Sequence, residues 1–351
     1  MSIQHLHFGF ESTLGAPSGI KRYSRMVGKA MGASTPTGWE FHVHEIPSLI
    51  RPLFSETWSR GIDTPFSARG AGNTENVHST SLFAPVNTSL RHVVTIHDLV
   101  PITHPETLSR NGVYWHLRML SLALEKAAAF VLPSVATFQS LSTYLSDNNL
   151  NKKITIAGGA PSLPPPNFTN SLGLDEKRYV VFLGTLEPRK RVDALIEAVS
   201  RLEDFSLVVL GNPGWGGVNP VNLARIYGLP SNRFHYLRNP TDQQVSNIVS
   251  KAQALVLPSQ SEGFGLPLVE AMALGTPVIH SDSQALVEVA GGSGITVPMS
   301  LKSELFVDGI CQAIEEAEKN RSRYASMGLN QSAKYSWGNT AKVIWETHQG
   351  L

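Results

Sequence analysis

Short apolar runs alternate with helix-spaced apolar positions along both halves of the chain. Ile20, Tyr23 and Val27 recur at helical spacing in the first half, and Val192 and Leu195 do so in the second. Alternating strands and helices predict an α/β fold with two parallel sheets, each covered by helices on both faces. We expect strands at 4–8, 41–46, 93–96, 130–133, 153–156, 179–184, 206–211, 254–258 and 277–281.

A proline-rich segment divides the chain near its middle. Prolines from Pro161 to Pro166 stiffen this segment and exclude both a helix and a central strand. The length of 351 residues exceeds what one hydrophobic core usually serves. We therefore predict a first domain at 1–165 and a second at 166–335. Ligands should bind at the carboxyl ends of the strands of such sheets.

The composition adds limits on partners and location. A hydrophobic fraction of 42% and a charged fraction of 16% describe an ordinary globular protein, and a net charge of +1 gives no reason to expect a nucleic-acid partner. The single cysteine, Cys311, cannot form an intramolecular disulfide. The start reads as a strand, and no run of about 18 apolar residues occurs. We expect a cytoplasmic protein, with peripheral contact at the inner face of the plasma membrane left open and the oligomeric state undetermined.

Two features of the first half are harder to interpret. The stretch 39–87 is rich in Ser, Thr, Pro, Gly and Asn. This composition suits either a loop that faces an acceptor substrate or a plain surface loop. Nine of the twelve histidines precede residue 166. We expect most of them to be surface or core residues, because no His/Cys spacing matches a zinc site. No metal is predicted.

The segment from Ser261 to Ile279 is the most informative in the chain. Glu262 and Glu270 stand with seven residues between them, and Gly263, Gly265 and Pro267 lie between them. Glycines allow backbone N–H groups to approach a ligand closely, and the first turn of a helix favours an anion. Carboxylates accept hydrogen bonds from sugar hydroxyls. The segment therefore suits a sugar phosphate, and the alternative is a plain strand–helix turn with solvated glutamates.

Three other strand-to-helix turns carry candidate chemistry. Arg189 and Lys190 follow the apolar run 179–184, where adjacent cations could hold a diphosphate or simply face solvent. Gly19 lies in a turn after the first strand. His97 follows the strand 93–96 and could bond a hydroxyl, or could be a structural histidine beside a capping Asp98.

These motifs, in this order, resemble the family 4 retaining glycosyltransferases, which have the GT-B fold. The segments Ser261–Glu270 and Tyr179–Arg191 resemble the family's paired-glutamate and Arg-Lys signatures. His97-Asp98-Leu99-Val100-Pro101 is similar to a subgroup of mannosyl- and rhamnosyltransferases that make bacterial surface polysaccharides. Thr185 departs from the family, which commonly has Arg there, and Ser18 replaces the first of two adjacent glycines. The relative weight of Arg189 and Lys190 is therefore open.

The resemblance implies two Rossmann-like domains that face a central cleft. The first would be on the acceptor side and would be joined by a terminal helix at about 336–351, while the second would bind the nucleotide sugar. Trp337 and Trp345 of this helix would then be packing residues.

The resemblance also implies roles for the candidate residues. Glu270 would bind the ribose. Arg189 and Lys190 would stabilise the leaving diphosphate with help from Gly19, and His97 would contact the sugar from the opposite domain. Glu262 and the backbone amides of four further residues would hold sugar hydroxyls and phosphate, these four being Gly263, Phe264, Gly265 and Leu266.

The expected activity is metal-independent transfer of a hexose to a glycan or lipid-linked acceptor, with no cofactor besides the nucleotide-sugar substrate. No Asp-x-Asp sequence occurs, so cationic side chains must neutralise the diphosphate. The subgroup favours GDP-mannose, with UDP-glucose or UDP-N-acetylglucosamine as alternatives. Two other classes remain: a sugar-nucleotide or glycan-binding protein without activity, and a nicotinamide-dependent oxidoreductase. The oxidoreductase would require a Gly-x-Gly-x-x-Gly turn that the first loop lacks.

Overall fold

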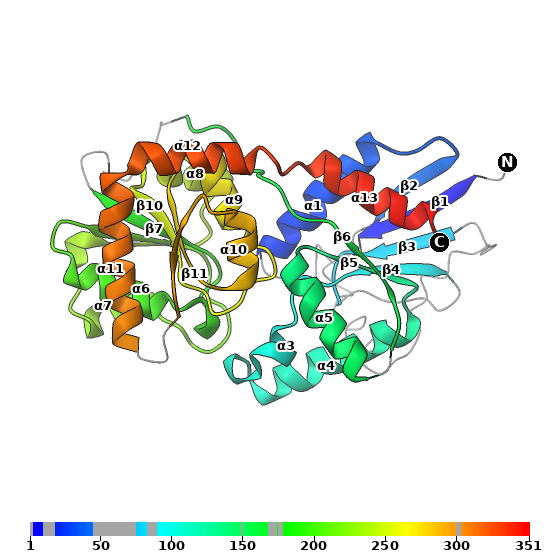
Figure 1. Ribbon diagram of the computed structural model, residues 1–351, viewed down its shortest axis with the longest axis horizontal. Helices are drawn as coiled ribbons and strands as arrows, with labels where there is room; N and C mark the ends of the chain where they lie inside the picture. Colours follow the sequence, from blue (N-terminus) through cyan, green and yellow to red (C-terminus); the bar gives the residue numbers. More distant parts are fainter. Residues whose placement is uncertain are drawn as a thin grey trace. The chain divides into compact units, whose positions relative to one another are not determined.

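The chain folds into two compact units (Figure 1). The amino-terminal unit comprises 1–159 together with 336–351, and the carboxy-terminal unit comprises 160–335. The computed structural model describes residues 3–9, 18–44, 75–82, 90–148, 150–167, 174, 178–299 and 303–351. Most of the stretch 39–87, and the loop before Gly19, lie outside these residues.

The amino-terminal unit contains a six-stranded parallel sheet with the order β2-β1-β3-β4-β5-β6. One face of its centre is packed by apolar side chains of β4 and β5 against α4 and α5. The strands are β1 (Gln4–Gly9), β2 (Trp39–His44), β3 (Glu75–Ser79), β4 (Arg91–Thr95), β5 (Ala129–Leu132) and β6 (Lys153–Ile156). The helices are α1 (Ser18–Ala33), α3 (Val100–Thr103), η1 (Pro105–Thr107), α4 (Arg110–Lys126), α5 (Val135–Asp147) and α13 (Trp337–Gln349).

The terminal helix α13 is part of the amino-terminal unit. Trp337 lies edge-on to Tyr23 of α1 with 5.7 Å between ring centroids. Trp345 packs against Trp39 and Phe41 of β2, and its indole N–H donates to the carbonyl of Met31. The prediction that both tryptophans are packing residues is confirmed.

The carboxy-terminal unit contains a second six-stranded parallel sheet, with the order β12-β11-β10-β7-β8-β9. The strands are β7 (Tyr179–Leu183), β8 (Ser206–Leu210), β9 (Phe234–Leu237), β10 (Ala254–Leu257), β11 (Val278–Ser281) and β12 (Ile295–Val297). The helices are η2 (Pro188–Lys190), α6 (Val192–Arg201), α7 (Pro220–Ile226), η3 (Ser231–Arg233), α8 (Asp242–Lys251), α9 (Leu266–Ala273), α10 (Gln284–Ala290), α11 (Ser303–Lys319) and α12 (Arg321–Ser332).

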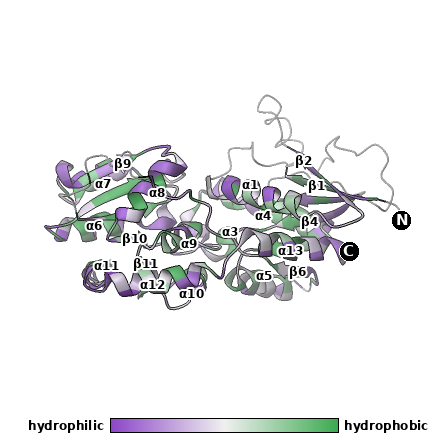
Figure 2. Cartoon of the chain, turned by 90° about the horizontal axis from the view of Figure 1, so that it is seen from above, coloured by the Kyte–Doolittle hydropathy of each residue, from purple (hydrophilic) through white to green (hydrophobic). Residues whose placement is uncertain are grey.

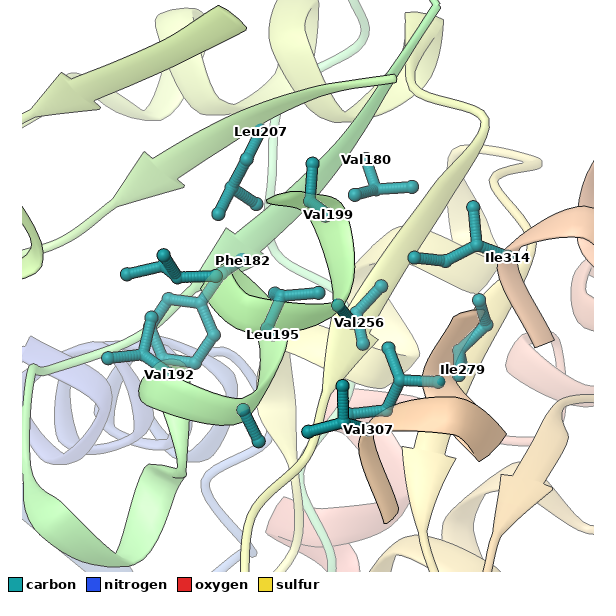
Figure 3. Close-up of a cluster of buried hydrophobic side chains, with 14 of the residues drawn as sticks. Val180, Phe182, Val192, Leu195, Val199, Leu207, Val256, Ile279, Val307 and Ile314 are labelled. Carbon is teal, nitrogen blue, oxygen red and sulfur yellow. The ribbon is translucent and has the colours of Figure 1, made fainter. Parts of the chain in front are cut away.

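Both faces of this second sheet are buried, which explains its continuous apolar strands. In β7, Val180 and Phe182 point to one face, where they pack with side chains of α6 and α11 (Figure 3). Tyr179 and Val181 point to the other face, where α8, α9 and α10 supply the apolar partners. Figure 2 shows the strands of this sheet mostly in the hydrophobic colour, whereas the helices carry both hydrophilic and hydrophobic residues.

The α/β prediction with two doubly wound parallel sheets is confirmed, and nine strands were placed within two residues of their observed starts. Three strands were missed. The sequence of β3, Glu-Asn-Val-His-Ser, is polar although the strand is central, and β9 and β12 are short edge strands. The units divide after Gly159, six residues before the predicted boundary, because Pro164 and Asn167 hydrogen-bond to α8. In the described part of the chain, every helix is too short or too polar to cross a bilayer.

Candidate active site

The candidate site lies where the strand order of the second sheet reverses. From β7 the chain proceeds to β8 and β9 on one side of the sheet, and then to β10, β11 and β12 on the other. The neighbouring strands β7 and β10 are therefore followed by loops that diverge from a common point. Ligands of open α/β sheets bind at such a point, outside the carboxyl ends of the strands. Arg189 and Lys190 follow β7, and Glu262 follows β10.

A short 3₁₀ turn presents the two cations. Pro188 begins this turn, Lys190 ends it, and Arg191 then takes a left-handed conformation with φ of 48° before α6 begins. Arg191 pairs with Asp193 and lies over the ring of Phe306, so its side chain serves the helix start. The basic pair therefore stands on a separate 3₁₀ turn between β7 and α6.

Hydrogen bonds join this turn to the loop that contains Glu262. The backbone N–H of Gln260 donates to the carbonyl of Arg189 at 2.7 Å. In return, Nη1 of Arg189 donates to the carbonyl of Ser261 at 2.6 Å. The two loops are thus held in a fixed relation before any ligand binds.

The basic pair divides between two carboxylates. Nε of Arg189 lies 2.9 Å from Oε2 of Glu187, whose side chain is 1% exposed. Lys190 donates from Nζ to Oε1 of Glu262, and the hydroxyl of Ser259 donates to the same oxygen at 2.8 Å. Nη1 of Arg189 lies 3.5 Å from the other oxygen of Glu262. Two positively charged and two negatively charged side chains therefore form one network with no net charge.

Burial and neighbouring charges shift the pKa values of Lys190 and Glu262, which face each other. Desolvation lowers the pKa of the Lys190 ammonium below its ordinary value, Arg189 acts in the same direction, and Glu262 opposes them. For Glu262, burial alone would raise the pKa, but Lys190, Arg189 and the bond from Ser259 outweigh burial and leave the pKa below its ordinary value. Glu262 is thus an ionised carboxylate at neutral pH. A buried, desolvated ammonium gains strongly from a further anionic partner.

The first turn of α9 adds backbone donors beside this network. Gly265 caps the helix in a left-handed conformation with φ of 95°, which glycine adopts without strain. The helix then begins at Leu266, with Pro267 in its first turn. Phe264 is buried against the ring of Tyr335, so only its backbone could serve a ligand.

Glu270 lies one turn further along α9 and is 3% exposed. Its Oε1 accepts a hydrogen bond from the hydroxyl of Ser162 at 2.8 Å. Ser162 belongs to the proline-rich segment, which thereby orients the carboxylate. Burial here argues against the alternative of solvated glutamates.

His97 lies in the amino-terminal unit, just past the carboxyl end of β4. Its Nε2 donates to the carbonyl of Thr80 at 2.7 Å, so Nδ1 carries the lone pair. The ring is edge-on to Tyr23 at 4.9 Å, and burial lowers the pKa of the imidazole, so His97 is neutral at pH 7. Oδ1 of Asp98 accepts a hydrogen bond from the N–H of Val100 at 3.2 Å, although Leu99 occupies the N-cap position of α3. Gly19 occupies the first turn of α1, where a Cβ would meet no atom within 4 Å.

A family model decides the classification of the second unit. Residues 166–329 match the model for glycosyl transferases group 1. The carboxy-terminal unit is a group 1 glycosyltransferase domain. It contains Arg189, Lys190, Glu262 and Glu270, and its reversal point carries three of them.

Curated relatives of this glycosyltransferase domain include mannosyltransferases. The O-antigen chain mannosyltransferase B of Escherichia coli is 27% identical over 262 residues, which cover 71% of this chain and 68% of that protein. The chain spans only 26% to 32% of the length of the serotype-specific mannosyltransferases WbdA of E. coli, which are 25% to 28% identical. These comparisons support a glycosyltransferase enzyme that transfers a hexose.

Solved structures share the fold of this chain over nearly its whole length. The sucrose-phosphate synthase of Thermosynechococcus elongatus has a TM-score of 0.74 at 16% identity and covers 99% of this chain and 98% of its own. Alr3699/HepE of Anabaena, solved with UDP and glucose, has a TM-score of 0.69 at 16% identity and covers 99% and 100%. The GT-B fold is confirmed by these neighbours.

Three residues of the glycosyltransferase network were missed from the sequence. Glu187, Ser259 and Ser261 hold the basic pair and Glu262 in place. Glu187 lies two residues before Arg189. An acidic residue so near two adjacent cations could have indicated an ion pair from the sequence. The turn at Gly211–Trp215 packs against the loop after β7 through a bridge between Leu186 and Pro213.

Proposed function

We propose that this chain transfers mannose from GDP-mannose to a glycan or lipid-linked acceptor, with retention of the anomeric configuration. The observation that carries the proposal is the network of Arg189, Lys190 and Glu262 at the reversal point of the second sheet. The mannosyltransferases among the relatives favour mannose as the sugar. A lipid-linked acceptor would bring the enzyme to the cytoplasmic face of the membrane.

The charge balance of the network indicates a role for Lys190 in binding the diphosphate. Two cations already meet two carboxylates, so an arriving diphosphate finds no surplus positive charge. Arg189 is fixed by Glu187 and by the carbonyl of Ser261. Lys190 is the cation that can exchange its partner. We propose that it turns from Glu262 to the diphosphate when the donor binds.

The same exchange frees Glu262 for the sugar. A carboxylate released from Lys190 can accept hydrogen bonds from sugar hydroxyls. The amides of Gly263, Phe264, Gly265 and Leu266 would hold sugar hydroxyls and phosphate at the start of α9. Glu270, oriented by Ser162, would accept from the ribose hydroxyls.

Two further candidate residues, Gly19 and His97, belong to the amino-terminal unit. Gly19 offers a first-turn N–H to an anion. Neutral His97 is proposed to contact a sugar hydroxyl, with Thr80 fixing its tautomer. This assignment rests on the position of His97 after β4.

The proposed reaction needs neither a protein nucleophile nor a metal ion. The bond between the anomeric carbon and the phosphate oxygen breaks, and the acceptor oxygen bonds to the same face of that carbon. The acceptor proton passes to the departing phosphate oxygen, which leaves GDP as product. Lys190 and the amides at α9 stabilise the charge that develops on this leaving group, and they act more strongly on the transition state than on the bound donor.

UDP-glucose or UDP-N-acetylglucosamine is the second candidate donor. Alr3699/HepE, which shares the fold, was solved with UDP and glucose. In this proposal the network would meet the phosphate and hydroxyls of either donor, so the base and the sugar must be tested directly.

Calorimetric titration of the three donors, paired with release of the nucleoside diphosphate, tests the proposal. We expect GDP-mannose to bind most tightly and to be hydrolysed slowly without an acceptor. Tighter binding of a UDP-sugar would replace the donor assignment. Binding without hydrolysis or transfer would indicate a binding protein, and binding of NADH alone would indicate an oxidoreductase.

A further inference from the structure

One face of the first two strands carries a column of polar titratable side chains. Leu6 and Phe8 of β1 are buried, with Phe8 beside Gly28 of α1, while His5 and His7 alternate with them and point to the opposite face. The parallel register pairs His5 with Glu40 of β2. This column comprises His5, His7, Glu40, His42 and His44.

Three donor atoms in this column converge at one point. Nδ1 of His5 lies 3.3 Å from Nε2 of His42 and 3.4 Å from Oε2 of Glu40. Nε2 of His42 lies 3.7 Å from the same oxygen of Glu40. Tetrahedral zinc binds imidazole nitrogen and carboxylate oxygen at about 2.0–2.2 Å, which separates neighbouring ligands by about 3.3–3.6 Å. Two of the three separations fall in this range, and the third, 3.7 Å between His42 and Glu40, is slightly longer.

We propose that His5, Glu40 and His42 form a site for a divalent transition metal, with zinc as the best fit. Two imidazoles and one carboxylate are ligands that zinc takes, and the fourth position is left for water. The side chains are 33% (His5), 39% (His42) and 51% (Glu40) exposed, so an ion can reach them. Glu75 of β3 pairs with His5 in register on its other side, and its Oε2 meets no donor among the described residues. A second carboxylate beside the site further favours a cation.

The position of this site separates it from hexose transfer. His5 and Glu40 each lie one residue past the start of their strands, whereas His97 lies past the carboxyl end of β4. The metal would tie the edge strand β2 to β1. We therefore expect removal of the metal to lower the thermal stability of the chain without changing donor hydrolysis.

The test is a titration of the chelator-treated full chain with Zn²⁺, and with Co²⁺ as a spectroscopic probe. We expect one ion per chain and the intense visible absorption of four-coordinate cobalt. His42→Ala and Glu40→Gln should each weaken binding by about tenfold or more, since loss of even an outer-shell partner costs about 10–100-fold. His104→Ala is the matched control, because His104 lies in the same unit outside the column, and it should change nothing.

Several results would overturn the assignment. One is no saturable binding to the parent chain; another is equal affinity in Glu40→Gln, a change at a half-exposed side chain that the fold tolerates. A third is loss of binding in His44→Ala but not in Glu40→Gln, which would move the ion to the pair of His7 and His44, whose ring nitrogens lie 2.9 Å apart. A simple hydrogen bond between His5 and His42 would give the first of these results.

Discussion

Arg189 and Lys190 are neighbours in sequence, but their shortest contacts with carboxylates are to different residues. Arg189 is held by Glu187, which is almost fully buried, and by the carbonyl of Ser261. Lys190 meets Glu262 on the adjacent loop. Arg189 therefore joins the two loops, and we propose Lys190 as the cation that a ligand engages.

Removing Arg189 should cost stability more than any other change in the network. Arg189→Ala leaves the buried charge of Glu187 without its partner, and breaking a buried pair in this way costs about 3–5 kcal/mol. Urea unfolding should show this loss. The double variant Glu187→Leu with Arg189→Met should recover most of it, because both charges are then removed. An Arg189→Ala variant as stable as Lys319→Ala, a change at an exposed lysine, would contradict the structural role.

At the scale of elements, apolar runs predicted the strands that are buried on both faces. The strand β3 was missed because its central position buries the polar residues Asn76 and His78. The imidazole of His78 is hydrogen-bonded to His348 and Thr95, and no local sequence pattern reveals these tertiary contacts. For the site, the glycines and acids around α9 could be predicted from their order. The partners Glu187 and Ser259, and the meeting of His5 with Glu40 and His42, depend on strand pairing and could not.

The start of α9 depends on Gly265. A Cβ at this position would lie 2.6 Å from Cδ2 of the fully buried Leu286, and φ is already 95°. Gly217 has a φ of 68°, but a Cβ there would meet no atom within 4 Å. Gly265→Ala should therefore lower the free energy of unfolding by about 2 kcal/mol or more, with a smaller loss in Gly217→Ala from backbone strain alone.

Urea unfolding and donor titration of the two alanine variants check this prediction. Gly265→Ala should also weaken donor binding, because it shifts the amides that begin α9, while Gly217→Ala should not. Equal stability and equal donor affinity in the two variants would show that neither property depends on glycine at position 265.

At the scale of the whole molecule, buried neutral histidines make the amino-terminal unit sensitive to acid. Burial lowers the pKa of His92 and of His348 to about 3, and His92 and Lys153 add to the effect on His348. Burial also lowers the pKa of His78 well below its ordinary value, with His348 adding to it. In the unfolded chain each of these groups titrates near about 6.5.

Stability should therefore fall as the pH drops below about 6.5 and should continue to fall toward about pH 3. In this range the unfolded chain binds protons on these histidines and the folded chain does not. Each buried histidine contributes a slope of up to about 1.4 kcal/mol per pH unit in this window. Urea unfolding at several pH values measures the slope. His348→Gln should flatten it, and His104→Gln, outside the buried group, should not. A slope unchanged by His348→Gln would contradict this account.

The central claim is that Lys190 exchanges Glu262 for the donor diphosphate and stabilises its departure. The most direct test is the single-turnover rate of hexose transfer by Lys190→Ala at saturating donor, compared with Lys319→Ala. Loss of a preorganised charge contact predicts a rate lower by about 10²–10³-fold, with the fold intact by circular dichroism. A Lys190→Ala variant that transfers hexose at the parent rate would contradict the claim.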